Sequence, residues 1–353
     1  MLTWKELVSR SQGLTLADKT AAKTLDILNK FQALHNSNSK YHNILTLLLM
    51  FEHAECKDDR DRIFALISLA SDLAPIPNEV RTHLQQSIKY SLVPKPIFFD
   101  PDYSKSSEEV YMAFATAALR SAQPYHILQC AGAFPARGVE SNIKGKGKSN
   151  SEEPNAINHK GCIAQQHASR SQTPVARFER PSSTETLPSW VPDWRNGPSR
   201  YRPLLGVTSF RAGSWTTTAP NFVVGGNQLR LRGAYVGTIG GILDWNLAKI
   251  SIPKHVGLPW TSSSNHDMSS DRILFLTDTG LYGAGPRSIQ VGDEIFLFPG
   301  SKVPFVLRDA SNVVNSDVGN DTYLLVGDCF LHNAMEGQLV AVAREAEREV
   351  IIA

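Results

Sequence analysis

Apolar residues recur at helical spacing through the first 135 residues. The stripe at Ile44, Leu47, Leu48 and Phe51 is typical of one face of an α-helix. Two further stripes share this spacing, at Leu25, Leu28, Phe31 and His35 and at Ile63, Leu66, Ile67 and Ala70. Ser106-x-x-Glu109 fits a capping box, which predicts another helix from about residue 106. A shorter helix is expected over residues 79–90, inside a Pro-rich connector.

The apolar period changes to two from Leu187 onward. Residues 229–232, Leu-Arg-Leu-Arg, alternate strictly. Four more short runs are rich in β-branched and aromatic residues: Ile273–Leu276, Glu294–Phe298, Val303–Leu307 and Tyr323–Val326. Gly and Pro separate the runs, at Gly225-Gly226, Gly240-Gly241, Gly283-Ala-Gly-Pro286 and Pro299-Gly300. This pattern predicts a small β-barrel or sandwich, and the alternating charges of Ala341–Val350 suggest a terminal helix.

Residues 136–187 have a different composition. Lys144-Gly-Lys-Gly-Lys148 is followed by Ser, Asn, Gln, Pro and Glu with few large apolar side chains. Such a segment buries too little apolar surface to offset chain entropy, so it is predicted to be a disordered linker or insertion. The expected class is α+β, with a helical region over 1–135, the linker over 136–187 and a β-rich domain over 188–353.

Composition narrows the function classes. The 353 residues carry a formal net charge of +2, which gives no drive toward nucleic acid or an anionic membrane. The four cysteines are scattered without a CxxC pair, so neither a disulfide framework nor a zinc site of the usual kind is indicated. No secretory signal opens the chain, and the longest apolar run, Ile44–Phe51, is far shorter than the roughly 20 residues of a membrane span. We expect a soluble, reduced, cytoplasmic protein with no membrane span.

An acidic cluster precedes the third stripe. Asp58, Asp59 and Asp61 alternate with Arg60 and Arg62. A metal or acid–base role needs a second set of ligands that converge on the cluster. We interpret it instead as helix capping together with ion pairs from the arginines to neighbouring loops.

Two histidine–cysteine groupings are also weak sites. His159, Cys162 and His167 offer three zinc ligands where a structural site needs four, and they fall in the predicted linker. Cys329 and His332 lie three apart at a strand end, which puts their side chains on opposite faces and argues against a catalytic dyad.

The glycine pairs do not form phosphate loops, because no Gly-x4-Gly-Lys-Ser/Thr string is present. No serine stands in a nucleophile-elbow string either. Gly283-x-Gly285-Pro286 is interpreted as a turn between strands. No catalytic, cofactor-binding or metal-ligating residue is therefore predicted, and no cofactor.

Trp190 and Trp194 flank a proline in the most distinctive local string, Trp-Val-Pro-Asp-Trp. Their rings either pack on the helical region and fix the direction of the chain or form an exposed partner surface. We favour packing, because large aromatic side chains are mostly buried.

Several strings stand in a fixed order along the chain. They are Asp58-Asp-Arg-Asp-Arg-Ile-Phe-Ala65, Pro101-Asp-Tyr-Ser-Lys-Ser106, Trp190-Val-Pro-Asp-Trp194, Gly283-Ala-Gly-Pro286, Val303-Pro-Phe-Val-Leu-Arg308 and Tyr323-Leu-Leu-Val-Gly-Asp-Cys-Phe-Leu-His332. Together they resemble the downstream part of fungal heterokaryon-incompatibility (HET) domain proteins. Ser68 departs from the pattern, since the family often has Gly there.

The strings that define the HET domain itself are not found between Met1 and His53. They read Tyr-x-Ala-Leu-Ser-Tyr-x-Trp-Gly and Trp-Ile-Asp-x-Ile-Cys-Ile-Asn-Gln, and the family's cell-death activity is attributed to that module, which is similar to TIR domains. The resemblance therefore implies a non-enzymatic regulatory or partner-recognition module of an incompatibility-type protein that lacks its effector. A protein partner is expected, without nucleic acid. The alternatives are a remnant NAD-cleaving or other hydrolytic enzyme and a vestigial truncated protein.

Overall fold

The computed structural model describes residues 26–27, 29–30, 42–76, 96–135, 187–206, 210–214, 221–243, 271–310 and 322–353. They belong to two compact units: unit 1 comprises Met1–Ile127 with Trp194–Ser199, and unit 2 comprises Leu128–Asp193 with Arg200–Ala353. The linker predicted over 136–187 lies, apart from Leu187, outside the described residues. The stripe at Leu25, Leu28, Phe31 and His35 and the helix expected over 79–90 lie outside them too. The domain bounds therefore stay a prediction, whereas the mixture of helices and strands confirms the α+β class.

Unit 1 contains short helices whose apolar faces are buried. Helix α3 (Ile44–Met50) begins at Asn43, whose side chain accepts the Leu45 N–H. Helix α6 (Ser107–Leu119) begins with the predicted capping box: the Ser106 hydroxyl accepts the Glu109 N–H, and the Glu109 carboxylate accepts the Ser106 N–H. In this part of the chain the sequence pattern and the structure agree.

The third predicted helix is shorter than its apolar stripe. Helix α4 (Asp61–Phe64) ends after one turn, and the 3-10 helix η1 (Ile67–Leu69) follows. The hydrogen bonds here span three residues, as in a 3-10 helix. Leu66 N–H donates to the Ile63 carbonyl, and Leu69 N–H donates to the Leu66 carbonyl. It then enters strand β1 (Leu73–Ala74), which pairs in parallel with β2 (Ile97–Phe98).

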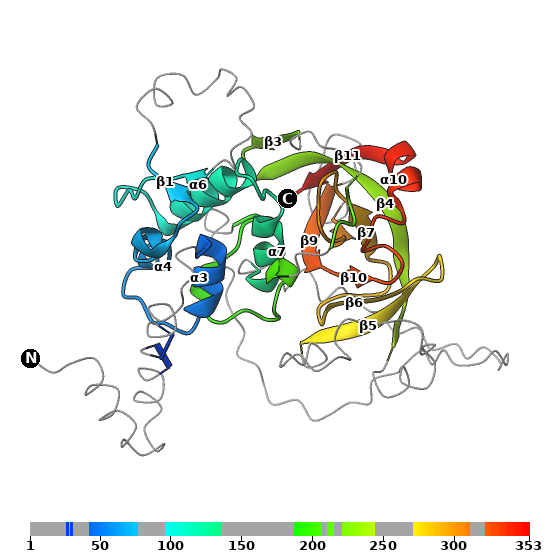
Figure 1. The fold of residues 1–353 in the computed structure, drawn as a ribbon, viewed down its shortest axis with the longest axis horizontal. Helices are drawn as coiled ribbons and strands as arrows, with labels where there is room; N and C mark the ends of the chain where they lie inside the picture. The colour runs from blue at the N-terminus through cyan, green and yellow to red at the C-terminus, as the bar shows by residue number, and fades with distance from the viewer. Residues whose placement is uncertain are drawn as a thin grey trace, which may run out of the picture. The chain divides into compact units, whose positions relative to one another are not determined.

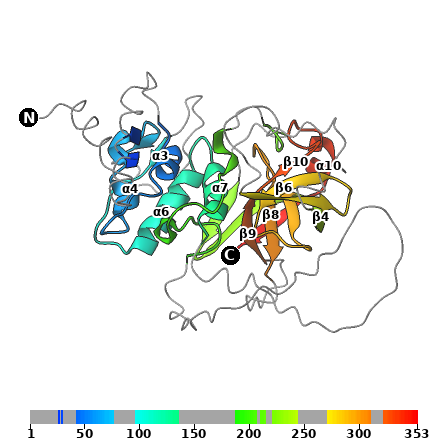
Figure 2. The ribbon, with the colours of Figure 1, turned by 90° about the horizontal axis from the view of Figure 1, so that it is seen from below.

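Unit 2 is built on one large sheet (Figures 1 and 2). Its strands are β3 (Phe222–Gly225), β4 (Gln228–Leu243), β5 (Arg272–Thr277), β6 (Tyr282–Pro286), β7 (Glu294–Leu297), β8 (Phe305–Asp309), β9 (Thr322–Asp328), β10 (Phe330–Leu331) and β11 (Glu347–Ile352). They form a nine-stranded sheet in the order β10-β6-β5-β4-β11-β9-β8-β7, with β3 paired to β4.

A further pairing between β4 and β7 closes part of this sheet into a ring. The ring runs β4-β11-β9-β8-β7 and back to β4, and β11 is antiparallel to β4 and parallel to β9. Of the two architectures that the sequence pattern predicts, the barrel is confirmed. Strands β5, β6 and β10 extend the sheet beyond β4.

Alternation sets the register of β4 as predicted. Leu229 and Leu231 are buried, and Arg230 and Arg232 are exposed. Gly240 and Gly241 do not separate two strands, however, because β4 continues through them with a register shift between Ile239 and Gly241. The glycine pair marks a bulge inside a long strand rather than its end.

The predicted turn at Gly283-x-Gly285-Pro286 is wrong, because these residues lie in strand β6. A side chain at Gly283 would collide with the ring of Phe275 on the neighbouring strand β5. Glycine is needed here for close packing, not for a change of direction.

The terminal helix expected over Ala341–Val350 is wrong in its second half. Helix α10 (Val340–Glu345) ends at Ala346, and β11 follows at once. The apolar end of this segment, Val350-Ile-Ile352, is buried and pairs with β4, so sheet pairing overrides the helical charge pattern.

Helix α7 (His126–Ala133) begins at the end of unit 1 and continues into unit 2. None of the helices in the described part of the chain is long and apolar enough to cross a membrane.

Candidate functional site

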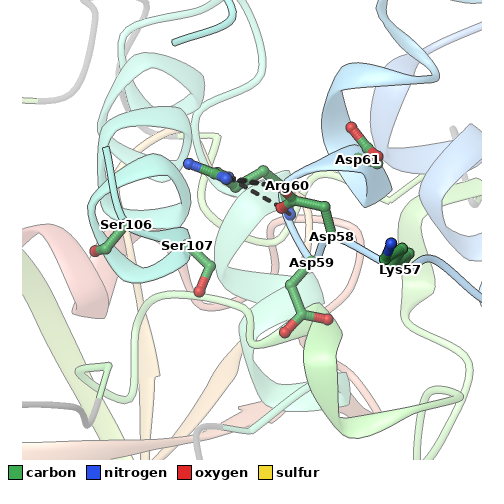
Figure 3. A pocket seen from close by; sticks show the side chains of 7 residues that line it. All are labelled: Lys57, Asp58, Asp59, Arg60, Asp61, Ser106 and Ser107. Atoms are coloured by element: carbon green, nitrogen blue, oxygen red, sulfur yellow. Dashed lines mark hydrogen bonds and ion pairs between the residues drawn. The ribbon is translucent and has the colours of Figure 1, made fainter. Parts of the chain in front are cut away.

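An open depression in unit 1 coincides with the acidic cluster (Figure 3). Its volume is about 600 Å³, and it is lined by Lys57, Asp58, Asp59, Arg60, Asp61, Ser106 and Ser107. The loop before α4 supplies the charged side chains, and the first residues around α6 supply the two serines.

Asp58 and Arg60 form the centre of this depression. Arg60 Nη2 lies 2.7 Å from Asp58 Oδ2, and Arg60 Nε lies 2.9 Å from Asp58 Oδ1. These hydrogen bonds lower the pKa of Asp58 to about 2. Arg60 Nη1 also donates to the carbonyl oxygens of Tyr103, at 2.6 Å, and Lys105, at 2.7 Å. The arginine therefore fastens the loop before α6 to the turn before α4.

Tyr103 completes this fastening from the other side. Its hydroxyl donates to Asp61 Oδ1 at 2.6 Å, which raises the pKa of Tyr103, and its ring stands edge-on to Phe64 at 4.9 Å. The expected contacts from arginine to a neighbouring loop are present. Asp58 also has a capping role at the turn that leads into α4, since its Oδ1 accepts the Arg60 N–H at 3.0 Å, whereas Arg60 at the N-cap position itself makes no side-chain cap bond.

No group of three His, Cys, Asp or Glu residues within the described ranges is placed to hold a metal ion. The His159, Cys162 and His167 grouping lies outside those ranges. The chemistry that the depression itself offers is charge pairing and hydrogen bonding.

A second polar cluster lies at the core of unit 2, around Asp328 at the end of β9. Asp328 Oδ1 lies 2.7 Å from Arg272 Nη2, and the two side chains are 0% and 1% exposed. Arg272 Nη1 also donates to the Asp328 carbonyl oxygen at 2.9 Å. A buried pair of this kind is costly to break, because one charge is then left uncompensated.

The second carboxylate oxygen of Asp328 is bonded as well. It accepts from Gln129 Nε2 of α7 at 3.2 Å and from the Leu204 N–H at 2.7 Å. The Tyr201 hydroxyl accepts the Asp328 N–H at 3.3 Å, and the Arg272 guanidinium lies 4.7 Å from the Tyr201 ring. We call Gln129, Tyr201, Arg272 and Asp328 the Asp328 cluster.

Two glycines leave room for the Tyr201 side chain of this cluster. Gly327 has a φ of +151°, and a side chain there or at Gly132 would collide with the Tyr201 hydroxyl. The sequence analysis named Gly327 and Asp328 only as part of a string and missed Gln129, Tyr201 and Arg272. The sequence does contain one sign of this cluster, the Gly327-Asp328 pair at the end of an apolar strand. A charge buried there needs a partner elsewhere in the chain.

The buried cysteines of unit 2 are poor nucleophiles. Burial raises the pKa of Cys130 and of Cys329 well above the usual range. Cys329 belongs to an apolar cluster with Phe275 and Val326, and His332 is partly exposed. Cys329 precedes strand β10 and His332 follows it, and the raised pKa of the buried Cys329 thiol argues against a catalytic dyad as well.

The tryptophan string is buried. Trp190 is 0% exposed, and its Nε1 donates to the Asn227 carbonyl in the turn between β3 and β4. Trp194 is 3% exposed and meets the rings of Tyr111 and Phe114 on α6, at 5.2 and 5.6 Å. The packing interpretation is confirmed, with Trp194 on the helical side as predicted and Trp190 within unit 2. The exposed-surface alternative is wrong.

Ser189, which directly precedes the tryptophan string, contacts two strands of the ring. Its hydroxyl donates to the Ala353 carbonyl and accepts the Leu325 N–H at 2.9 Å. The residue before the string thus links the end of β11 to β9.

Comparison with known proteins shows which proteins the chain is similar to. Residues 260–351 match the family model of the Het-6 beta-barrel domain. The resemblance to heterokaryon-incompatibility proteins is confirmed. Heterokaryon incompatibility protein 6, OR allele, of Neurospora crassa is 37% identical over 75 residues, which are 21% of this chain and 10% of that protein. The chain thus spans about a tenth of that relative's length, and no solved structure matches it.

Proposed function

We propose that this chain is a non-enzymatic regulatory or partner-recognition module of a heterokaryon incompatibility-type protein, acting in the cytoplasm in non-self recognition that leads to programmed cell death. The observation that carries the proposal is the Het-6 barrel match over residues 260–351, on a closed ring of strands.

Two buried carboxylates of unit 2, Asp328 and Asp293, support a structural role over a catalytic one. Asp328 is committed to Arg272, and Asp293 is held by Arg308 through Nε at 2.7 Å. A catalytic carboxylate needs a free oxygen within reach of a substrate, whereas these carboxylates fix strands and loops in place.

The proposal is tested by deleting the gene in its fungal source. Fusion between the deletion strain and an incompatible strain is expected to give viable heterokaryons, scored with a vital dye, and the full chain should restore cell death. A death reaction of unchanged strength in the deletion strain would show that the chain has no part in non-self recognition.

The enzymatic alternative has its own test. The purified full chain is incubated with NAD, and we expect no turnover above the buffer control. NAD cleavage that a single substitution in the folded chain abolishes would replace the non-enzymatic proposal.

A further inference from the structure

An arginine of the barrel lies within a cage of aromatic rings and a carboxylate. The Arg348 guanidinium on β11 is 5.8 Å from the Tyr235 ring centre and 5.3 Å from the Phe296 ring centre. Its Nη2 lies 2.9 Å from the Tyr323 hydroxyl and 3.2 Å from Glu294 Oε2. We call Tyr235, Glu294, Phe296 and Tyr323 the barrel cage, and its residues come from β4, β7 and β9.

The cage is rigid. Phe296 and Tyr323 are buried, and their rings meet at 5.3 Å and 67°. Tyr235 stands edge-on to Phe296 at 6.0 Å, and its hydroxyl bonds to Thr238 Oγ1 at 2.7 Å. Aromatic rings in fixed positions beside a carboxylate form the kind of site that binds a cation through ring faces and charge together.

Arg348 occupies the cage on the side that faces solvent. The Arg348 side chain is 45% exposed, and Tyr235 is 36% exposed. Ion pairs and cation–π contacts at such exposed positions are individually weak, because water competes for the charge. The rings and the carboxylate that hold Arg348 can hold another cation by the same contacts.

Charge around the cage favours a cationic ligand. Asp278 Oδ1 accepts the Thr238 N–H at 2.9 Å, and its Oδ2 lies 3.4 Å from the Tyr235 hydroxyl. Two carboxylates, Glu294 and Asp278, thus border the cage, while Arg348 supplies one positive charge to it. Within the described residues Asp278 has no ion pair.

We propose that the barrel cage is the docking site for an Arg or Lys side chain from a basic segment of a partner protein, and that Arg348 fills the cage until the partner displaces it. This inference rests on the proposed partner-recognition function and names the surface and the chemistry of the partner. A purely structural Arg348 makes a different prediction, since its removal then creates no binding site.

The test uses the full chain and a short Arg–Gly peptide as the probe, with a Glu–Gly peptide as the charge control. Arg348→Ala empties the cage and is expected to bind the Arg–Gly peptide about tenfold more tightly by calorimetry, because the competing internal occupant is gone. Arg232→Ala is the matched control. Arg232 lies on β4, is paired with Glu347 outside the cage and is 59% exposed, so its removal should leave the affinity unchanged.

Tyr235→Ala added to Arg348→Ala is expected to abolish the gain. Affinity of Arg348→Ala no higher than that of Arg232→Ala, with both variants folded by thermal melting, would overturn the proposal. Self-association of Arg348→Ala that Tyr235→Ala abolishes would assign the cage to a second copy and overturn the partner assignment.

The unaltered chain gives a measurement that does not depend on the variants folding. The Arg348 Nε–H resonance is expected to shift toward its solvent-exposed value at saturation with the Arg–Gly peptide, and not with the Glu–Gly peptide. An unshifted resonance at saturation overturns displacement. If Tyr235→Ala keeps the cell-death reaction that the deletion strain lacks, the cage proposal fails and the proposed function stands.

Discussion

One buried carboxylate, Asp328, links several segments of unit 2. Asp328 accepts hydrogen bonds from three parts of the chain through its side chain: β5, α7 and the segment at Leu204. Each bond alone is ordinary, but all of them depend on one carboxylate. These bonds explain why Asp follows Gly at positions 327 and 328 of the sequence string Tyr323–His332.

Asp328→Ala is expected to lower the free energy of unfolding by about 3–5 kcal/mol, because the Arg272 charge stays buried without its partner. Urea denaturation measures the loss. Asp328→Leu combined with Arg272→Met, which removes both charges, should cost less than the single change. A double variant as unstable as the single one would argue against an uncompensated charge as the cause.

Asp58 gives a pH dependence in unit 1. Its pKa in the folded chain is lowered from the ordinary 3.8 to about 2, mainly by hydrogen bonds from Arg60. A lowered carboxyl pKa contributes stability that is present above the unfolded pKa and is lost as the pH falls from about 4 through 2. NMR titration should place the Asp58 midpoint near 2, and Arg60→Ala should return it toward 3.8. A midpoint that Arg60→Ala leaves in place would contradict this cause.

Elements differ in how far the sequence determines them. The α6 capping box and the alternation of Leu229–Arg232 depend on neighbouring residues, and the structure has both as predicted. The strand at Gly283 and the strand β11 depend on partners far along the chain, Phe275 and β4. Local patterns do not specify which strands pair, so these two elements could not be predicted.

Ser106→Ala removes half of the capping box and is expected to lower the free energy of unfolding by about 1 kcal/mol. Ser68→Ala, on the exposed side of η1, is the matched control and should change it little. Chemical denaturation of both variants decides the point. Equal effects would mean that the box adds nothing to the stability of α6.

At the scale of the molecule, the compact β unit is larger than the family match. The match begins at residue 260, whereas the ring needs β4 and the Asp328 cluster needs Gln129 and Tyr201. Unit 2 therefore includes most of helix α7 and strands β3 and β4, which precede the matched segment.

A fragment of residues 260–351 is expected not to fold by itself, because it lacks the strand that pairs with both β11 and β7. A fragment of residues 128–353 contains every partner of the Asp328 cluster and should melt cooperatively. Circular dichroism with thermal melting compares the two. A cooperative melt of the short fragment would show that β4 is dispensable.

Strand β11 follows every other strand of the ring in the chain, yet it joins β4 to β9. A ribosome therefore releases β4, β7, β8 and β9 before the strand that completes their ring. Until translation reaches residue 352, β4 and β9 expose backbone groups that β11 later covers, and such unpaired edges favour aggregation. The nascent chain is then a natural client for a chaperone, and a stop codon before β11 would leave the ring open.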